Sequence, residues 1–197
     1  AMNRLQKHRG PDGEGTWSHP SKVVGLAHVR LSIIDLTSGS QPMTDRAGNW
    51  IVYNGEIYNY IELRKQLGED NFTTTSDTEV ILLAYRKWGE ACLDHLRGMF
   101  AFALWDEKEQ RLFCARDHFG IKPLYFTVQD GIFYFASEIK ALLPFLPRIS
   151  TCVEALKDYL VFQLCLKEKT LFKDVLELQP GHKLTIQRGT VRAERFW

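Results

Sequence analysis

The chain of 197 residues is 45% hydrophobic and 12% aromatic, so it can bury the core of one large domain or of two small ones. Its 25 Lys and Arg residues balance 24 Asp and Glu residues, and the net charge of +1 argues against nucleic acid or an anionic membrane as a partner. The sequence has no run of about 18 apolar residues, and AMNRLQKHRG at its start lacks the apolar stretch of a signal peptide. We therefore expect a globular, cytoplasmic protein without a membrane segment.

The first elements predicted along the chain are a loop and two strands. Residues 8–15, HRGPDGEG, are rich in Gly, Pro and Asp and predict the loop. Residues 22–36 are rich in β-branched and apolar side chains and predict a strand, which a return loop at residues 37–42 ends. Residues 49–54 predict the second strand by the same signals.

The pair Asn54-Gly55 is the strongest short signal for a two-residue hairpin turn, because both residues tolerate positive φ. The residues after the pair do not alternate as a second strand would, since apolar residues in 57–67 recur at helical spacing. Asn59 and Glu62 occupy the N-cap and N3 places of a capping box. The pair is therefore predicted to end a strand and to precede a helix.

A second helix is predicted from about Asp77 to Trp88. Ser76 and Glu79 form a capping box at its start, and Gly89 stands where a glycine commonly ends a helix. The spacing therefore predicts both ends of this helix.

After a short predicted helix at residues 90–96, four strand-like runs follow one another. Strands joined by such short links must be antiparallel, because a parallel connection needs about a dozen residues or more. The four runs are residues 99–106, 111–117, 122–128 and 131–137.

The last third of the chain begins with a short predicted helix, SEIKALL. Thr151 and Glu154 offer a third capping box for a helix that runs to about Gln163, and the chain closes as a hairpin that turns near Arg188-Gly189. Strands in runs and helices in a pair favour an α+β layered fold with largely antiparallel sheets. A break near residues 147–150 divides the chain into a main domain, residues 1–147, and a C-terminal extension, residues 148–197.

The cysteines do not suggest a metal or a disulfide framework. Their spacing shows no CxxC pair and no metal-ligand pattern, and buried free thiols are common in apolar runs. We predict that all four are reduced and structural, and we predict no metal site. They are Cys92, Cys114, Cys152 and Cys165.

Several polar side chains stand at predicted strand ends and helix starts, where sites are commonly built. Each also has an ordinary structural interpretation: Arg30 as an exposed strand charge, Asp77 as a partner of a helix dipole, Arg116-Asp117 as an ion pair in a turn. His28 is a lone histidine in an apolar strand and is interpreted as structural.

Taken together, these residue types suggest a ligand. An Arg fork, an Asp carboxylate and a backbone amide beside an Asn side chain match the carboxylate, the ammonium and the polarised carbonyl of one amino-acid amide, such as glutamine. No Ser-His-Asp order, HExxH, P-loop or GxGxxG pattern is present, so triad hydrolysis, zinc chemistry and glycine-loop nucleotide binding have no support.

Eight motifs then follow one another across residues 8–143: HRGPDG, AHVRLSIIDL, QPM, YNGEIYNY, SDTEVIL, GMFAFALWD, RDHFGIKPLYF and ASEIKAL. In this order they resemble the glutaminase domain of asparagine synthetases, a class II glutamine amidotransferase domain of the N-terminal-nucleophile (Ntn) hydrolase fold. LFKDVLELQPGHKL and the final RFW resemble the stretch that leads into the synthetase domain of that family. The resemblance implies a four-layer αββα sandwich of two largely antiparallel sheets.

The resemblance also implies a reaction. In this family the thiolate of an N-terminal Cys attacks the side-chain amide of glutamine, its own α-amine acts as the base, ammonia leaves, and a glutamyl thioester is hydrolysed. The implied oxyanion hole is the Asn54 side chain with the Gly55 N–H. The implied substrate-binding residues are Arg30 for the carboxylate, Asp77 and Glu56 for the ammonium, and the backbone at Leu31 and Ile33 for the shape of the pocket.

One feature of the family is missing from this sequence. It begins AMNRLQKHRG rather than with Cys-Gly, and the family layout places about twenty residues, with the nucleophile and the first strand, before this point. None of the four cysteines has a free α-amine beside it to act as base. We expect a missing upstream segment and a chain that is inactive alone; the alternative is a homologue that binds glutamine without turnover.

The second half of the family reaction is also absent from this sequence. It has no SGGxDS-like pyrophosphate loop, so no cofactor is expected in this domain, and ATP and Mg²⁺ are expected only in the synthetase domain. The implied partners are glutamine and the enzyme's own synthetase domain, with a homodimer left open. An amidotransferase of the same class with another acceptor is the alternative to asparagine synthesis.

Overall fold

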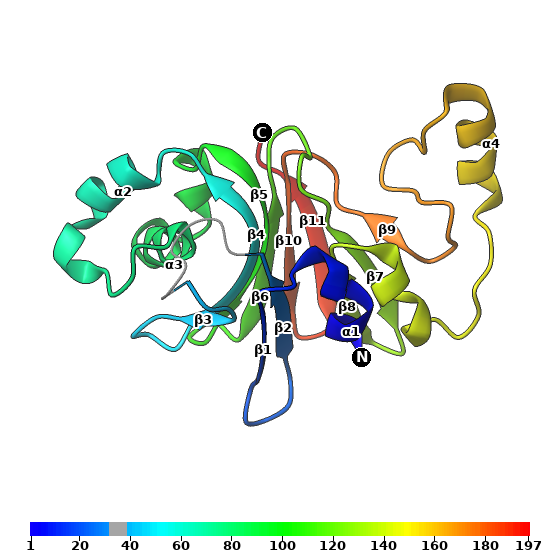
Figure 1. Cartoon of the computed structure of the whole chain (residues 1–197). Helices are drawn as coiled ribbons and strands as arrows, with labels where there is room; N and C mark the ends of the chain where they lie inside the picture. Colours follow the sequence, from blue (N-terminus) through cyan, green and yellow to red (C-terminus); the bar gives the residue numbers. More distant parts are fainter. Residues whose placement is uncertain (32–38) are drawn as a thin grey trace.

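The structure is a computed structural model that describes residues 1–31 and 39–197. At its centre lies an antiparallel sheet in the strand order β11-β10-β6-β5-β4-β3 (Figure 1). The strands of this sheet are β3 (Met43–Thr44), β4 (Trp50–Ile57), β5 (Gly98–Asp106), β6 (Arg111–Arg116), β10 (His182–Gln187) and β11 (Thr190–Arg195).

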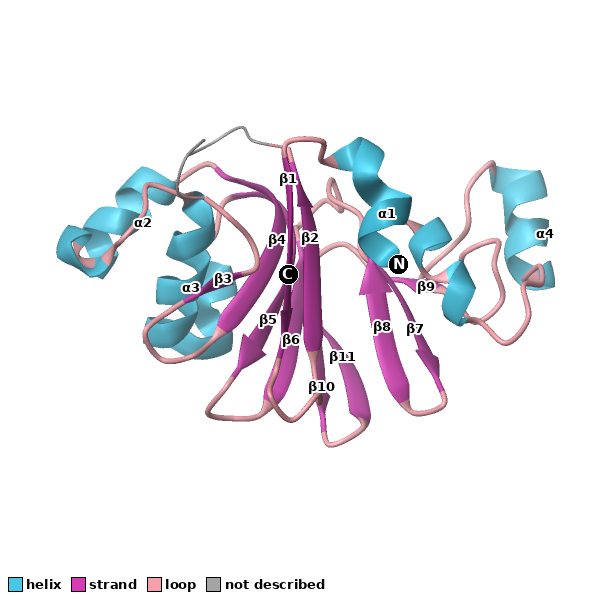
Figure 2. Ribbon diagram, turned by 60° about the horizontal axis from the view of Figure 1, so that its bottom comes forward, coloured by secondary structure: helices cyan, strands magenta, loops and turns pink. Residues whose placement is uncertain are grey.

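Two smaller antiparallel sheets form the second layer. One pairs β1 (Gly13–Ser18) with β2 (Gly25–Arg30), and the other has the order β8-β7-β9. Figure 2 shows β2 and β8 as the facing members of these two sheets. The strands of the second sheet are β7 (Tyr125–Gln129), β8 (Ile132–Ala136) and β9 (Leu176–Glu177).

Helices lie on the outer sides of both layers. α2 (Tyr60–Leu67) and α3 (Asp77–Trp88) cover the central sheet, while α1 (Met2–Gln6) and α4 (Val153–Phe162) lie on the far side of the smaller sheets (Figure 1). The fold is therefore the predicted four-layer αββα sandwich. The shorter 3₁₀ helices span Lys7–Arg9, Glu69–Asn71, Gly89–Asp94, Ile139–Ala141 and Leu143–Phe145.

Strand β5 shows why the central sheet lies between two cores. Successive side chains of a strand point to opposite faces, so Phe100, Phe102 and Leu104 pack with α2 and α3, whereas Ala101 and Ala103 pack with the smaller sheets. Both faces are covered, and the strand accordingly reads as a continuous apolar run, GMFAFALWD.

The first eighteen residues differ from the sequence prediction. The loop predicted at residues 8–15 is wrong, because a 3₁₀ helix ends at Arg9 and β1 begins at Gly13. Gly15 signals a turn by its type, but it lies inside the strand where the backbone of Gln41 passes; a Cβ there would lie 2.1 Å from the Gln41 oxygen. The helix α1 was not predicted. Of the strand predicted at residues 22–36, residues 25–30 form β2 and residues 32–36 lie outside the described residues.

The pair Asn54-Gly55 does not end its strand. β4 continues through it to Ile57, so the prediction of a strand end at this point is wrong. A Cβ on Gly55 would lie 2.1 Å from the carbonyl oxygen of Met99 and 2.8 Å from the Cα of Phe100. Glycine stands here because the backbone of β5 approaches closely, a reason that the local sequence does not reveal.

Two of the three predicted N-caps, Asn59 and Ser76, are correct in position, and their predicted contacts are only partly present. Asn59 is the N-cap of α2, but its amide donates to the His95 oxygen and accepts from the Arg97 N–H instead of capping the helix. For α3, predicted from Asp77 to Trp88 and observed there, Ser76 Oγ accepts from the Thr78 N–H.

Two further capping predictions differ from the structure, one in its contacts and one in its position. The Glu79 carboxylate accepts from the N–H and hydroxyl groups of Thr73 and Thr74, so it closes the loop before the helix rather than the box with Ser76. The N-cap of α4 is Cys152, one residue after the predicted Thr151. The predicted short helices at residues 90–96 and 137–143 are 3₁₀ turns.

The four consecutive strands do not form one meander. β5 pairs with β6 and β7 with β8 as predicted, but β6 and β7 belong to different sheets. The C-terminal hairpin is confirmed, with Arg188 and Gly189 at positive φ in its turn. The domain boundary near residue 147 stays a prediction; β10 and β11, which lie beyond it, extend the central sheet through the pairing of β10 with β6.

Candidate functional site

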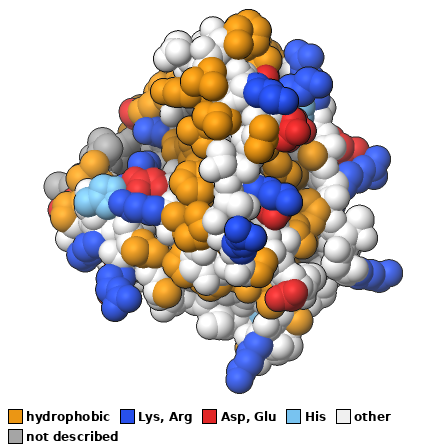
Figure 3. All heavy atoms as spheres, turned by 90° about the vertical axis from the view of Figure 1, so that its right-hand side faces the viewer, with side chains coloured by type: hydrophobic (Ala, Val, Ile, Leu, Met, Phe, Trp, Pro, Cys, Tyr) orange, Lys and Arg blue, Asp and Glu red, His pale blue; other side chains and the backbone are white. Residues whose placement is uncertain are grey.

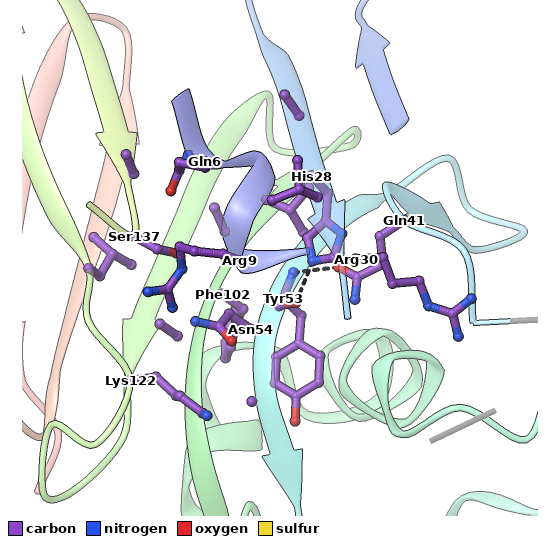
Figure 4. A pocket seen from close by; sticks show the side chains of 18 of the residues that line it. Gln6, Arg9, His28, Arg30, Gln41, Tyr53, Asn54, Phe102, Lys122 and Ser137 are labelled. Atoms are coloured by element: carbon purple, nitrogen blue, oxygen red, sulfur yellow. Dashed lines mark hydrogen bonds between the residues drawn. The ribbon is translucent and has the colours of Figure 1, made fainter. Parts of the chain in front are cut away.

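A pocket of about 370 Å³ lies between the two sheet layers (Figure 4). Side chains of β4 and β5 form its floor, β2 and β8 its two walls, and α1 covers it from outside. α1 packs against β2 and against the 3₁₀ helix that follows β8, so it bridges the walls. Representative lining residues are Val52 and Ala101 from the floor, Val29 and Phe135 from the walls, and Met2 and Gln6 from α1.

Each wall of the pocket is a strand that has a neighbour on one side. In the described part of the chain, β2 pairs with β1 alone and β8 with β7 alone. Consecutive residues of both strands, 27–31 and 133–137, line the cavity. This is the pattern of a strand that turns its edge to the cavity, because a strand that presents a face would contribute alternate residues.

Asn54 lies in the floor of the pocket. Its side chain leaves β4 on the same face as Val52 and opposite to Tyr53, which packs toward α3. The nitrogen Nδ2 of Asn54 is buried and has no hydrogen-bond partner among the described residues. A buried donor without a partner costs about 1–3 kcal/mol, so this amide is kept at a cost that folding alone does not explain.

The N–H of Gly55 faces the free edge of β4. Tyr53 and Ile57, two residues to either side, turn their N–H groups to side chains: Tyr53 donates to Gln41 Oε1 at 2.6 Å and Ile57 donates to Asp77 Oδ2 at 3.0 Å. Residues two apart in a strand direct their backbone groups to the same side. The Gly55 N–H therefore lies between these two bonds, on the side of β4 away from β5.

The Asp77 carboxylate joins the start of α3 to β4. It is buried, and its Oδ2 also accepts from the Tyr53 hydroxyl at 2.8 Å. Burial, and then the charge of Asp77, raise the pKa of Tyr53 well above its ordinary value, so Tyr53 remains a donor. Asp77 is thus fixed beside the oxyanion pair predicted from the sequence.

Six of the seven predicted site residues line this one pocket, and the seventh, Ile33, lies outside the described residues. Arg30 ends β2, Leu31 follows it with 56% of its surface exposed, and Glu56 leaves β4 on the same face as Asn54. Figure 4 shows Arg30 and Gln41 on one side of Asn54, and Arg9 and Lys122 on the other. The roles assigned to these residues stay predictions.

His28 and Gln41 also line the pocket, and the sequence did not mark either as a site residue. His28 Nε2 donates to the Tyr53 carbonyl at 3.1 Å, so both backbone groups of Tyr53 are held by side chains. Burial lowers the pKa of His28 to about 4, and its Nδ1 has no partner among the described residues. The bond to Tyr53 agrees with the interpretation of His28 as structural, and the fold adds that His28 also lines the pocket. A usable signal was its spacing, two residues before Arg30 on one strand face.

Arg116 and Asp117 do not form the ion pair that the sequence suggested. Arg116 pairs with Glu177 at 2.8 Å and donates to the carbonyl of Lys122, while Asp117 accepts from the backbone N–H of Phe100 and of Lys122. Both residues therefore fasten the crossover from β6 to β7.

The cysteines lie away from the pocket. None of the four lines it, and all four are free thiols. Burial raises the pKa of Cys92 to about 12 and raises that of Cys114 as well, so neither is a thiolate at neutral pH. Within the described ranges, His, Cys, Asp and Glu side chains form no group of three that could hold a metal ion, and the helices include none long and apolar enough to cross a membrane.

Comparison with known proteins identifies the family. Residues 1–197 match the family described as glutamine amidotransferase domain. The chain is 45% identical over 189 residues to glutamine-hydrolyzing asparagine synthetase 1 of Bacillus subtilis (strain 168), which covers 94% of the chain and 30% of that protein. It is 43% identical over 198 residues to amidase chry2 of Gibberella zeae, with 98% and 29% covered. The chain thus spans about a third of the length of these relatives.

Solved structures show the same fold. Glutamine phosphoribosylpyrophosphate amidotransferase from Bacillus subtilis, complexed with ADP and GMP, superposes on the whole chain and on 45% of its own with a TM-score of 0.69 at 22% identity. The structure titled as the allosteric regulatory enzyme of purine biosynthesis gives a TM-score of 0.62 at 24% identity and covers 88% of this chain and 35% of its own. The predicted Ntn-hydrolase fold is confirmed, and with the match along its full length the chain belongs to the glutamine amidotransferase domain family.

Proposed function

We propose that this chain is the glutamine-hydrolysing part of an enzyme that makes asparagine from aspartate, glutamine and ATP-Mg²⁺, and that its task is to supply ammonia. One observation carries the proposal: Asn54 Nδ2, a buried donor without a partner among the described residues, stands beside the edge-facing Gly55 N–H in a pocket that Arg30 and Asp77 also line. The identity of 45% to a glutamine-hydrolyzing asparagine synthetase supports this choice of substrate.

Glutamine would bind through both ends. Arg30 would take the α-carboxylate through its planar fork, and Asp77 and Glu56 would take the α-ammonium. The side-chain carbonyl oxygen would lie between Asn54 Nδ2 and the Gly55 N–H. Backbone at Leu31 and Ile33 would shape the rest of the pocket.

The chemistry needs a thiolate that this pocket does not contain. In the proposed reaction a Cys sulfur bonds to the side-chain carbon of glutamine and its α-amine takes the thiol proton. The C–N bond then breaks, and ammonia leaves with that proton. Water hydrolyses the thioester to glutamate and the free thiol. Asn54 and Gly55 would stabilise the oxyanion of each tetrahedral intermediate, a contribution of about 3 kcal/mol per donor.

We propose that a strand upstream in the full-length polypeptide brings this Cys into the pocket. Among the described strands, β2 has β1 and β8 has β7 as its one neighbour, and residues 27–31 and 133–137 line the cavity on the other side of each strand. A strand inserted between them would join the two smaller sheets and lie over the floor that holds Asn54. In this position the Cys at the start of the inserted strand would lie next to Asn54 and Gly55.

The partners of the proposed enzyme follow from the same reaction. ATP, Mg²⁺ and aspartate would bind in a synthetase domain elsewhere in the full-length polypeptide. We propose a cytoplasmic enzyme, which the four free cysteines support, because free thiols without disulfide spacing are typical of reducing compartments.

The test is ammonia release by the full-length polypeptide supplied with glutamine, without aspartate or ATP. We expect steady ammonia and glutamate in equal amounts, and asparagine once aspartate and ATP-Mg²⁺ are added. If calorimetry detects glutamine binding while no ammonia is released, the chain is a glutamine-binding module and the proposal is wrong. Ammonia release without asparagine would indicate another acceptor.

A further inference from the structure

The helix α4 has almost no contact with the rest of the molecule. Of its ten residues, Ala155 alone is buried, although the helix reads VEALKDYLVF. Leu160 and Val161 keep 69% and 71% of their surface exposed, and Phe162 keeps 56%. A helix that packs on its own domain normally buries its apolar side, so α4 is exposed where an ordinary surface helix is not.

The exposed apolar residues of α4 and of the chain just after it are together called the α4 surface. Figure 3 looks onto the side of the molecule where α4 lies and shows apolar side chains gathered across it among scattered charges. Large exposed apolar patches on folded proteins mark interaction sites. The residues that define the α4 surface are Val153, Leu156, Leu160, Val161, Phe162 and Leu164.

The segment that carries α4 is held firmly at its base. The Cys152 N–H donates to the Leu171 carbonyl at 2.9 Å, and the Lys173 N–H donates to the Ser150 carbonyl at 2.9 Å. Asp158 on the helix pairs with Lys169 on the returning chain. These bonds join the chain before α4 to the chain after it, so they fix the position of the helix on the domain.

The apolar residues of α4 point to more than one side. Successive helical residues are 100° apart, so Leu160 and Phe162 lie about 200° apart, on nearly opposite sides of the axis. A two-fold contact between copies would cover one side of each helix. A helix that is apolar around most of its circumference fits a groove in a larger body, where both sides are buried.

We propose that the α4 surface is the face through which this chain docks onto the synthetase domain of its own polypeptide, an inference that rests on the proposed function. The lengths of the relatives support a large docking partner within one polypeptide. α4 lies within the region that matches the family, and this chain spans only 30% of the similar asparagine synthetase and 29% of the similar amidase. Most of each relative is therefore available to cover this surface.

The first experiment measures the oligomeric state of the 197-residue chain by sedimentation. We expect monomers of the wild type, of Leu160→Glu and of the control Val23→Glu, which changes a residue of similar exposure, 62%, in the turn between β1 and β2. All three should unfold at the same temperature, because neither side chain is buried. A defined dimer that Leu160→Glu dissociates and Val23→Glu does not would overturn the proposal and make the α4 surface a contact between copies.

The second experiment compares amide hydrogen exchange of residues 153–166 in the chain and in the full-length polypeptide. We expect exchange about 100-fold slower in the full-length protein. Leu160→Glu, and Val161→Lys as a second variant, should return it to the rate of the chain, and Val23→Glu should not. Equal rates in both proteins, or a reading frame that encodes nothing beyond residue 197, would overturn the proposal.

Ammonia release measured on the same preparations separates the two proposals. Leu160→Glu should release ammonia from glutamine at the wild-type rate, because α4 lies outside the pocket. A full-length protein that protects α4 but releases no ammonia would leave the docking surface in place and refute the glutaminase. A full-length protein that releases ammonia while α4 exchanges at the rate of the 197-residue chain would support the glutaminase and refute the docking surface.

Discussion

Asn54 holds a buried donor that the described protein does not use. Asn49, the residue just before β4, is buried too, but its amide donates to Asp45 Oδ2 at 3.0 Å and accepts from the Glu107 N–H at 3.1 Å. The two side chains have the same chemistry and opposite bonding, which makes them a matched pair for separating stability from function.

In the 197-residue chain we expect Asn54→Ala to leave the free energy of unfolding unchanged or slightly higher, because no hydrogen bond is lost. Asn49→Ala should lower it by about 1–3 kcal/mol, because Asp45 and the Glu107 N–H lose a buried partner. Urea unfolding measures both. A large loss of stability in Asn54→Ala would identify Asn54 as a structural residue.

Arg30 is expected to act through the geometry of its side chain. In the full-length enzyme Arg30→Lys should raise the KM for glutamine and change kcat little, because an ammonium is a point charge and cannot form the two parallel bonds of the guanidinium fork. Steady-state kinetics with varied glutamine measure the effect. An unchanged KM would count against Arg30 as the carboxylate partner.

Gly55 is constrained by the neighbouring strand. Gly55→Ala would place a Cβ 2.1 Å from the Met99 oxygen, and overpacking of this kind costs about 1–3 kcal/mol or more. Gly13→Ala in β1 is the control, because its Cβ would meet only ordinary contacts at 3.8 Å. Unfolding of the chain in urea should show a loss for Gly55→Ala alone, and equal stabilities would contradict the close approach.

At the level of elements, side chains replace a neighbouring strand along the edge of β4. β3 pairs with β4 only as far as Ile51. Beyond it, Gln41 and His28 hold the backbone of Tyr53, and Asp77 holds that of Ile57. Side chains thus hold the edge on both sides of Gly55, at Tyr53 and at Ile57.

The burial of His28 predicts a pH dependence of stability. Burial lowers the pKa of His28 from 6.5 to about 4, so between these values the unfolded chain binds more protons than the folded chain. The contribution of His28 to stability is then complete above pH 6.5 and decreases by about 1.4 kcal/mol for each pH unit between pH 6.5 and about 4.

Unfolding of the 197-residue chain at pH 7, 6 and 5 measures this slope. His28→Asn should be less stable at pH 7 and should lose most of the pH dependence. An equal slope in the variant would assign the titration to another group.

Some elements could be predicted from local sequence and others could not. Ser76 and Gly89 predicted both ends of α3, and a run of apolar residues predicted β5. β1 was missed because Gly13 and Gly15 signal turns by their type, whereas the reason for Gly15 is the backbone of Gln41, far along the chain. The 3₁₀ turns and the displaced N-cap Cys152 depend on packing that no short window contains.

At the scale of the whole molecule, the family motifs predicted the four layers of the sandwich. They did not predict which strand belongs to which sheet. β6 and β7 are adjacent in sequence, yet Asp117 and Arg116 turn the chain from one sheet to the other. His28 and Gln41 lie 25 and 12 residues from Tyr53 in the sequence, so their contacts with it became visible only in the fold. Asn54, Gly55, Arg30 and Asp77 could be named in advance because motifs carry them.

The arrangement of layers places the candidate site between the two sheets, with α1 outside it and α4 standing away from it (Figure 1). Ammonia would form in the pocket. The α4 surface would hold the synthetase domain of the same polypeptide against this domain. The central claim is that Asn54 and Gly55 stabilise the oxyanion of glutamine hydrolysis.

The rate of ammonia release from glutamine by the full-length polypeptide, wild type beside Asn54→Ala, tests that claim most directly. We predict that the variant keeps its fold and a similar KM, and that its kcat falls about 100- to 1,000-fold, the loss expected for one oxyanion donor. A variant that releases ammonia at the wild-type rate would contradict the account.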